Sequence, residues 1–135
     1  MKAKIAIVGS GNIGWALRQL LKDDYDVVQG DITDGFDATD ISQVKNFLNE
    51  VDAVISAGPF AVNKNIASVA AEQNIGYFDL TEDVETTEFI RSLKSNNILM
   101  PQCGLAPGAI NICAASMIDQ FDSVQEVLMR VGALP

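Results

Sequence analysis

The apolar positions of this chain follow two alternating spacings. Short apolar runs bounded by Gly, Pro, Asn or Asp predict β-strands, and apolar residues that recur every three or four positions predict helices. We therefore expect strands at residues 4–8, 26–29, 53–56, 77–80 and 98–100, with a further short strand around Phe36. The predicted helices run from about residue 12 to 22 and then lie around Ile41 to Leu48, Ile66 to Ala70, Phe89 to Leu93 and Ile110 to Met117.

This alternation of strands and helices indicates an α/β fold, because parallel strands are joined by helical crossovers that pack on the faces of the sheet. We expect a Rossmann-type, doubly wound parallel sheet in three layers (αβα), with helices on both faces. The first helix should bury an apolar stripe against the sheet. The stripe consists of Ile13, Ala16, Leu17, Leu20 and Leu21.

The last apolar positions follow a different pattern. Val127, Met129 and Val131 occupy alternate positions, as in a half-exposed strand of a second sheet. We expect residues 1–122 to form the Rossmann domain and residues 123–135 to form a strand that leads into a second domain absent from this sequence.

Length and composition narrow the class of protein. A chain of 135 residues, 48% hydrophobic and 20% charged, suits one globular domain. The net charge of −9, from 18 acidic and 9 basic residues, argues against nucleic-acid and anionic-membrane partners. The apolar run near the amino terminus is too short for an export signal, and no stretch is long enough to span a membrane. Because two cysteines provide neither a disulfide framework nor a metal site, we expect a cytoplasmic protein without a bound metal.

A glycine-rich segment follows the first predicted strand and opens the first helix. Its pattern, G-x-G-x-x-G, binds the pyrophosphate of a dinucleotide in that context. The first glycine permits a tight turn, the second lets the backbone approach the phosphates, and the third allows close packing of helix on strand. The helix amino terminus attracts the negative charge, and a plain turn is the alternative interpretation. The residues concerned are Gly9, Ser10, Gly11, Asn12, Ile13 and Gly14.

Asp31 lies seventeen residues after Gly14, at the end of the second predicted strand. A carboxylate there accepts hydrogen bonds from the adenosine ribose hydroxyls and repels the 2′-phosphate of NADP. Ile32 and Thr33 follow it, without an arginine to hold that phosphate. We therefore expect NAD rather than NADP, bound in part by Asp31 and Ile32. Taken alone, Asp31 also suits a solvated position at a strand end.

Two more segments fall at the carboxyl edge of the predicted sheet, where this fold binds its ligand. Asp37 and Ala38 follow the short strand at Phe36 and are expected to border the adenine, although Asp40 beside them equally suits a helix cap. A second segment has small residues that leave room for the nicotinamide ribose, with a simple strand-to-helix turn as the alternative. Its residues are Ala57, Gly58 and Pro59.

Four longer segments carry a resemblance to a known family. They are DAVISAGPF at residues 52–60, YFDLTED at residues 77–83, CGLAPGAINI at residues 103–112 and RVGALP at residues 130–135. With them the chain resembles, over essentially its whole length, the saccharopine dehydrogenase and lysine 6-dehydrogenase family. The resemblance implies an NAD(P)-dependent oxidoreductase that acts on a carbon–nitrogen bond of a lysine-like amino acid, by hydride transfer through an imine.

The resemblance also implies that this domain holds the cofactor, that a second α/β domain supplies most substrate contacts, and that the protein is a homodimer. Without that second domain the chain is expected to be inactive. Residues 104–108 are expected either beside the nicotinamide or simply at the start of the next helix. A different class of protein stays open, namely a stand-alone nucleotide-sensing regulatory domain of the potassium-uptake type, which shares the length and the glycine pattern.

No residue stands out as catalytic. Proton transfer in such a reaction uses His, Lys, Tyr, Asp or Glu, and the chain has no histidine. Glu82 is the best-placed carboxylate, because it follows the predicted strand at 77–80, yet it also suits a solvated or capping role. We expect Asp79 to be a buried structural acid and Cys103 to be a small packed residue, and we leave the catalytic residues unassigned.

Overall fold

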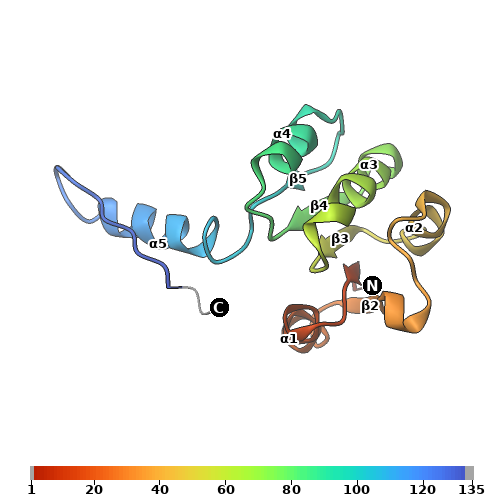
Figure 1. The fold of residues 1–135 in the computed structure, drawn as a ribbon. Helices are drawn as coiled ribbons and strands as arrows, with labels where there is room; N and C mark the ends of the chain where they lie inside the picture. The colour runs from red at the N-terminus through yellow and green to blue at the C-terminus, as the bar shows by residue number, and fades with distance from the viewer. Residues whose placement is uncertain (1, 133–135) are drawn as a thin grey trace.

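The body of the molecule is a five-stranded sheet in which all strands run parallel. The computed structural model describes residues 2–132. The strand order is β2-β1-β3-β4-β5, so the chain moves from β1 to one edge and then adds strands outward on the other side (Figure 1). This is the doubly wound arrangement predicted from the sequence. The strands are β1 (Lys4–Val8), β2 (Asp26–Gly30), β3 (Ala53–Ser56), β4 (Gly76–Asp79) and β5 (Leu99–Met100).

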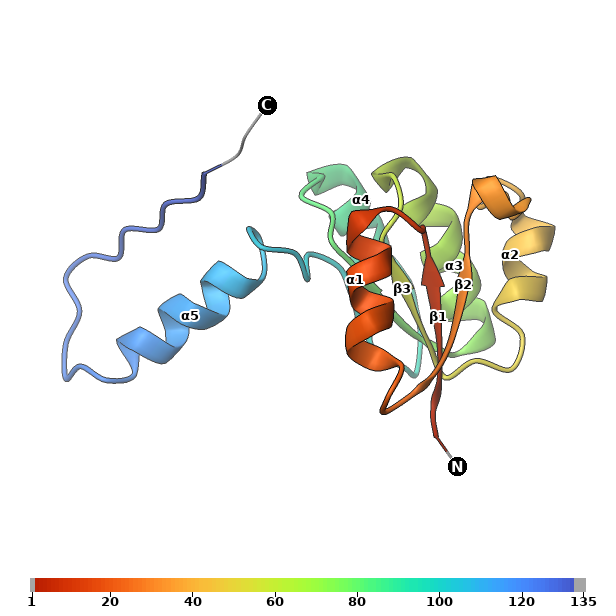
Figure 2. The same ribbon diagram turned by 90° about the horizontal axis from the view of Figure 1, so that it is seen from below.

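Helices cover the two faces of the sheet unequally. α1 contacts β1 and β2 on one face, whereas α3 packs against β3 and β4 on the other and lies between α2 and α4 (Figure 2). The three-layer αβα architecture is therefore confirmed. The helices, including the short 3₁₀ helices η1 and η2, are α1 (Asn12–Leu21), η1 (Ile32–Asp34), α2 (Ile41–Phe47), η2 (Phe60–Val62), α3 (Asn63–Gln73), α4 (Val84–Ser92) and α5 (Ala109–Ile118).

Local sequence sets the ends of several helices. The Asp40 carboxylate caps α2 by accepting a hydrogen bond of 2.8 Å from the N–H of Ser42. Asp83 caps α4 in the same way, through the N–H of Thr86 at 2.7 Å. α3 ends at Asn74, which adopts a left-handed conformation with a φ of 56°. These short polar residues position the loops at both ends of the sheet.

The main core lies between the sheet and the layer formed by α2, α3 and α4. Aliphatic side chains and one tyrosine fill it, so the sheet is anchored mainly from this side. Its most deeply buried members are Ala6, Val44, Leu48, Val54, Ile66, Ala67, Val69, Ala70, Tyr77 and Ile90.

The opposite face of the sheet carries an apolar row that is only partly covered. Ile7, Ile55, Phe78 and Met100 pair in register across four neighbouring strands and therefore point to the same face. Ile7, near α1, is completely buried. Ile55 and Phe78 are half-buried, and Met100 on β5 is 48% exposed. The row is closed at one end and open to solvent at the other.

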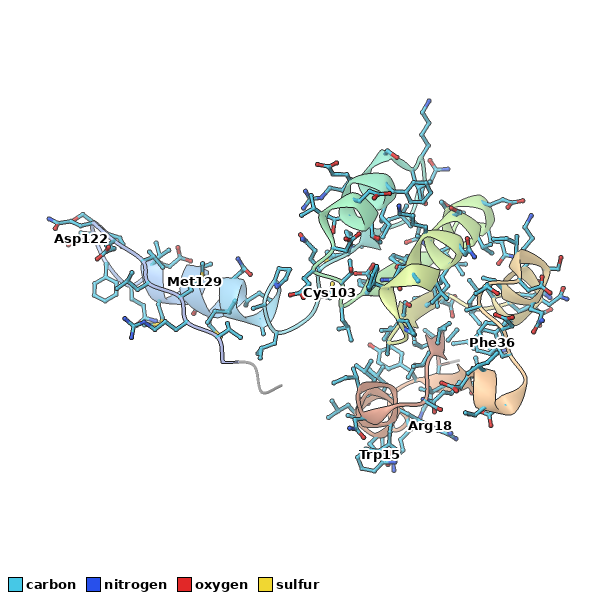
Figure 3. All side chains as sticks on the ribbon, viewed as in Figure 1. Trp15, Arg18, Phe36, Cys103, Asp122 and Met129 are labelled. Atoms are coloured by element: carbon cyan, nitrogen blue, oxygen red, sulfur yellow. The ribbon has the colours of Figure 1, made fainter. Side chains whose placement is uncertain are left out.

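The apolar stripe predicted for α1 is likewise buried only in part. Ala16, Leu17 and Leu21 are half-buried, whereas Ile13 and Leu20 are exposed, Leu20 by 75%. The physical reason is that α1 has its main contacts with β1 and β2 and none of similar extent with another helix. Trp15 and Arg18 point away from the sheet into solvent (Figure 3).

The strand predicted around Phe36 does not form. Residues after β2, an edge strand, turn into η1, which Gly35 closes with a φ of 86°. The Phe36 ring packs instead on the Phe47 ring, with centroids 4.5 Å apart. Both rings lie against Gly30, where a Cβ atom would meet them at 2.9 and 3.0 Å. Aromatic packing, rather than strand pairing, explains this apolar position.

The carboxyl-terminal residues form an arm that leaves the body of the domain. α5 has no buried residue, and the segment after it runs back alongside the helix (Figures 1 and 2). Asp122 and Met129 lie on this arm, away from the sheet (Figure 3). Although α5 is strongly apolar, neither it nor another helix of residues 2–132 has the length and apolar character that crossing a membrane requires.

The alternation from Val127 to Val131, predicted to be a strand of a second domain, forms no strand within the described part of the arm and stays a prediction for that domain. A strand needs a hydrogen-bonding neighbour, and residues 123–132 are assigned neither strand nor helix. Residues 133–135, the end of the predicted second segment, lie outside the described residues. The predicted domain boundary after residue 122 stays a prediction.

Candidate functional site

The carboxyl edge of the sheet begins with the glycine-rich turn between β1 and α1. Gly9 has a left-handed φ of 104°, and a Cβ atom there would meet the backbone of Ala57 at 2.9 Å. A Cβ atom at Gly14, in the first turn of α1, would lie 2.0 Å from the Gly9 carbonyl oxygen. The side-chain amide of Gln29 donates a hydrogen bond of 2.9 Å to the same oxygen. Both glycines are therefore required by the geometry.

The amino terminus of α1 is left open. Gly11 is its N-cap, no side chain caps it, and its first turn holds no acid, in contrast to the helices capped by Asp40 and Asp83. A Cβ atom at Gly11 would meet nothing within 4 Å, and Asn12 and Ile13 are exposed beside it. Because a helix amino terminus has free N–H donors and a partial positive charge, this position suits an anion.

Asp31 reaches from the end of β2 to the glycine-rich turn. Its Oδ2 accepts a hydrogen bond of 2.7 Å from the N–H of Ser10. Its Oδ1 accepts two from Thr33, at 3.0 Å from the N–H and 2.9 Å from the hydroxyl. The acid and the turn that the sequence assigned to one ligand are thus in direct contact.

These hydrogen bonds set the acid–base behaviour of Asp31. The N–H of Thr33, followed by the N–H of Ser10 and the Thr33 hydroxyl, stabilises the carboxylate and lowers its pKa from 3.8 to about 2. The unfolded chain lacks these donors, so its Asp31 keeps the ordinary pKa. The charged carboxylate therefore stabilises the fold above about pH 4, and this contribution is lost as the pH falls toward 2.

We expect Asp31→Asn to remove this part of the pH dependence. At neutral pH the variant should be less stable than wild type, because an amide is a weaker acceptor than a carboxylate. The difference should shrink between about pH 4 and pH 2, where the wild-type carboxylate takes up its proton. Urea unfolding at several pH values measures it. A difference that stays constant over this range would show that these donors do not hold the carboxylate.

A pocket of about 200 Å³ lies beside Asp31. Most of its lining was predicted from the sequence and consists of Gly9, Asp31, Ile32, Asp37, Ala38, Gly58 and Pro59. The remaining residues are Val8, Phe36, Thr39 and Val62. A mainly apolar lining with a few polar groups suits a flat base joined to a sugar.

A larger cavity, of about 710 Å³, opens at the carboxyl ends of β3 and β4. Gly58 lines both the cavity and the pocket beside Asp31, so the two spaces are adjacent. Glu82 and Asp83 bring carboxylates to the cavity, and no basic side chain is among the described residues that line it. Its lining is formed by Ser56, Gly58, Phe60, Asn63, Leu80, Thr81, Glu82, Asp83 and Val84.

A buried carboxylate, Asp79, lies under this cavity. Its Oδ1 accepts hydrogen bonds from the backbone N–H groups of Thr81 and Gln102, both at 3.0 Å. Its Oδ2 accepts from the Tyr77 hydroxyl at 2.7 Å and from the Asn63 amide at 3.2 Å. Asp79 is completely buried, so its predicted role as a structural acid is confirmed. It ties β4, α3 and the loop after β5 together.

Asn63 connects this network to the cavity. Its side-chain oxygen accepts a hydrogen bond of 2.7 Å from the Ser56 hydroxyl, and both residues are buried where they line the cavity. At the other end of the network, burial and then the negative charge of Asp79 raise the pKa of Tyr77, so that its hydroxyl remains a donor. The cavity therefore has a floor of fixed polar groups.

Other residues that the sequence singled out lie outside both spaces. Ala57 supports the Gly9 turn, and its N–H donates to the Val8 carbonyl at 2.8 Å. Residues 104–108 form a turn closed by a hydrogen bond of 2.8 Å from the N–H of Ala109 to the carbonyl of Gly104, and they do not line the cavity. Cys103 is exposed rather than packed, at the start of the connection to α5 (Figure 3).

Several residues of the site were missed from the sequence. Ser56 closes an apolar strand, and a polar residue at that carboxyl end is a signal that could have marked it. Asn63 had no such signal, because its hydrogen bond to Asp79 joins segments that are separated along the chain. Thr33 had none either, because its contact with Asp31 depends on the η1 turn.

The parallel sheet, the glycine-rich turn and the acid after β2 define a Rossmann-type domain. No profile of a known protein family matches the sequence. The fold is similar to that of apo saccharopine dehydrogenase (L-Glu forming) from Saccharomyces cerevisiae, with a TM-score of 0.71 and 20% identity over 87% of this chain and 31% of that one. It is also similar to an oxidoreductase from Sinorhizobium meliloti, with a TM-score of 0.64 and 16% identity over 89% and 42% of the two chains. This chain spans less than half the length of either structure, and it has a fold that occurs in oxidoreductases.

Proposed function

We propose that this chain is the NAD-binding domain of an oxidoreductase that acts on a carbon–nitrogen bond of a lysine-like amino acid. The observation that carries the proposal is a pair of neighbouring spaces along the carboxyl edge, because Gly58 lines both the pocket beside Asp31 and the larger cavity. A dinucleotide needs places for its adenosine, its pyrophosphate and its nicotinamide riboside. The fold shared with a saccharopine dehydrogenase supports the same assignment.

The residues around the smaller pocket would hold the adenosine end. In this proposal Asp31 accepts hydrogen bonds from the ribose hydroxyls, while Ile32 and Ala38 border the adenine. The pyrophosphate lies against Gly11 and the free N–H groups of α1. A carboxylate at the end of β2 favours NAD over NADP.

The cavity beyond β3 and β4 is the proposed place of the reaction. When bound, the nicotinamide ring supplies a hydride donor or acceptor for chemistry that passes through an imine. Ser56 and Asn63, held by Asp79, give the cavity a rigid polar floor, which fixes the orientation of what binds there. Glu82 and Asp83 create a negative field that attracts a cationic amine. A second domain would supply most of the substrate contacts.

Titration with NAD tests this proposal at Gly58. A Cβ atom there would lie 3.9 Å from its nearest neighbours, so the backbone accepts a side chain, and a leucine would narrow the spaces that Gly58 lines. We expect wild type to bind NAD, and Gly58→Leu to lose about tenfold or more in affinity at an unchanged melting temperature. Isothermal titration calorimetry and thermal unfolding measure the two quantities.

Ala71→Leu is a matched control, because residue 71 borders a separate surface depression at the end of α3. It should leave the affinity for NAD unchanged. The proposal fails if wild type does not bind NAD, or if Gly58→Leu binds it as tightly as wild type does.

A further inference from the structure

The polar floor of the larger cavity is a chain of hydrogen bonds that starts at a buried carboxylate. Asp79 Oδ2 accepts from the Asn63 amide at 3.2 Å, and the Asn63 oxygen accepts from the Ser56 hydroxyl at 2.7 Å. The three residues lie at the end of β4, the start of α3 and the end of β3, which are packed side by side (Figure 1). Asn63 and Ser56 also line the cavity. The chain thus runs from a completely buried acid to groups that a ligand can touch.

The acid fixes the direction of every hydrogen bond in this chain. Backbone N–H groups can only donate, and those of Thr81 and Gln102 both lie 3.0 Å from the Asp79 Oδ1. A carboxylate has only acceptor oxygens, so Asn63 must turn its NH₂ toward Asp79 and its own oxygen toward Ser56. Ser56 must then donate its one proton to Asn63.

The remaining hydrogen-bonding capacity of the Ser56 hydroxyl is as an acceptor. Ser56 is 1% exposed, and among residues 2–132 no group donates a hydrogen bond to its oxygen. Thr81, the other hydroxyl of the cavity lining, differs because its oxygen already accepts from the N–H of Asp83 at 3.1 Å. A ligand N–H group at Ser56 would satisfy the free acceptor, whereas a ligand oxygen would face its lone pairs. This part of the floor therefore recognises a donor.

We propose that Ser56 accepts a hydrogen bond from the carboxamide NH₂ of a bound nicotinamide, and that Asp79, acting through Asn63, is the positioning residue that sets this polarity. The inference rests on the proposed function, because it concerns the nicotinamide end of the same site. A cationic amine also offers N–H groups, but the carboxylates of Glu82 and Asp83 in the same cavity are stronger partners for a charged donor. The neutral hydroxyl oxygen suits the neutral amide.

The first test compares the binding of NAD with that of 3-acetylpyridine adenine dinucleotide, in which a methyl ketone replaces the amide and leaves no N–H. Wild type should bind NAD about tenfold more tightly, because only NAD brings a donor to the Ser56 oxygen. In Ser56→Ala this ratio of affinities should fall to about one. Thr81→Val is the matched control, because it removes the other hydroxyl of the cavity lining and should keep the wild-type ratio. Isothermal titration calorimetry measures the affinities.

The second test reverses the polarity of the chain. In Asp79→Asn the N–H groups of Thr81 and Gln102 still need an acceptor, so they hold the amide oxygen and the new NH₂ faces Asn63. Asn63 must then turn its own NH₂ toward Ser56, which frees the Ser56 proton for the cavity. The carbonyl oxygen of either dinucleotide can accept this proton, so the ratio should fall to about one through tighter binding of the acetylpyridine analogue. A merely structural role of Asp79 would weaken both ligands alike.

Asn63→Ala serves if Asp79→Asn does not fold, because it frees the Ser56 hydroxyl to turn either way and should also bring the ratio to about one. Wild type that binds neither dinucleotide would overturn the proposed function itself. Wild type that binds NAD, with the same ratio in Ser56→Ala or an equal fall in Thr81→Val, would overturn the contact at Ser56 alone. An unchanged ratio in Asp79→Asn, or in Asn63→Ala where that variant replaces it, would overturn the positioning role of Asp79.

Discussion

Replacement of Gly14 by alanine is expected to lower the free energy of unfolding by about 3 kcal/mol or more. The added methyl carbon would lie 2.0 Å from the carbonyl oxygen of Gly9 and 3.1 Å from the Gln29 side chain. A backbone oxygen cannot give way as a flexible side chain can, so α1 must move away from β1. The turn that is proposed to bind the pyrophosphate would open with it, and NAD affinity should fall together with stability.

Gly11→Ala provides the matched control. A Cβ atom at Gly11 meets nothing within 4 Å, so the free energy of unfolding should change by no more than about 1 kcal/mol. The methyl group would stand between the backbone and the proposed pyrophosphate, and NAD affinity should fall about tenfold or more. Urea unfolding and calorimetric titration separate the two effects. Wild-type stability of Gly14→Ala would contradict the close contact of α1 with β1.

Replacement of Asp79 by alanine is expected to destabilise the domain by about 3 to 5 kcal/mol. The carboxylate is completely buried and accepts hydrogen bonds from four donors. Alanine would leave three buried donors, and the half-buried N–H of Gln102, without an acceptor, and each orphaned buried group costs about 1 to 3 kcal/mol before the structure relaxes. The floor of the cavity at β3 and β4 should lose its rigidity at the same time.

A graded series makes this prediction specific to the network. Asp79→Asn should lie between wild type and Asp79→Ala, because an amide keeps one acceptor oxygen and turns its NH₂ toward donors. Tyr77→Phe should cost only about 1 kcal/mol, since Asp79 keeps three of its donors. Asp37→Ala removes a carboxylate that accepts hydrogen bonds from the neighbouring Thr39, outside the buried network, and should change the unfolding midpoint much less. Equal unfolding midpoints for Asp79→Ala and Asp37→Ala would show that Asp79 does not hold the loops.

The strands of the sheet could be predicted because each is an apolar run closed by residues that favour turns. β1 and β3 have their predicted bounds. Errors arose where an apolar residue serves another purpose. Phe36 has the local context of a short strand, but it packs on Phe47 from a separate segment, and such a pair has no periodic signature. The alternation from Val127 to Val131 is a different case, because it does not show whether a neighbouring strand is present, and it stays a prediction.

Residues of the candidate site could be predicted where the backbone conformation allows only one residue type or where a residue follows a strand of the sheet. Gly9 and Gly14 are explained by a positive φ and by a close approach, and Asp31 by its place after β2. The polar floor of the cavity could not be predicted, because it depends on tertiary contacts. The hydrogen bond from Asn63 to Asp79 joins two elements sixteen positions apart, and it exists only once α3 packs on β4.

The projecting arm has a thermodynamic consequence. Its helix, α5, is already hydrated in the folded chain, so unfolding uncovers little new apolar surface there. The steepness of a urea transition and the heat capacity of unfolding both scale with newly uncovered surface. Both quantities should therefore match a domain of roughly a hundred residues, about the length of the sheet and its packed helices.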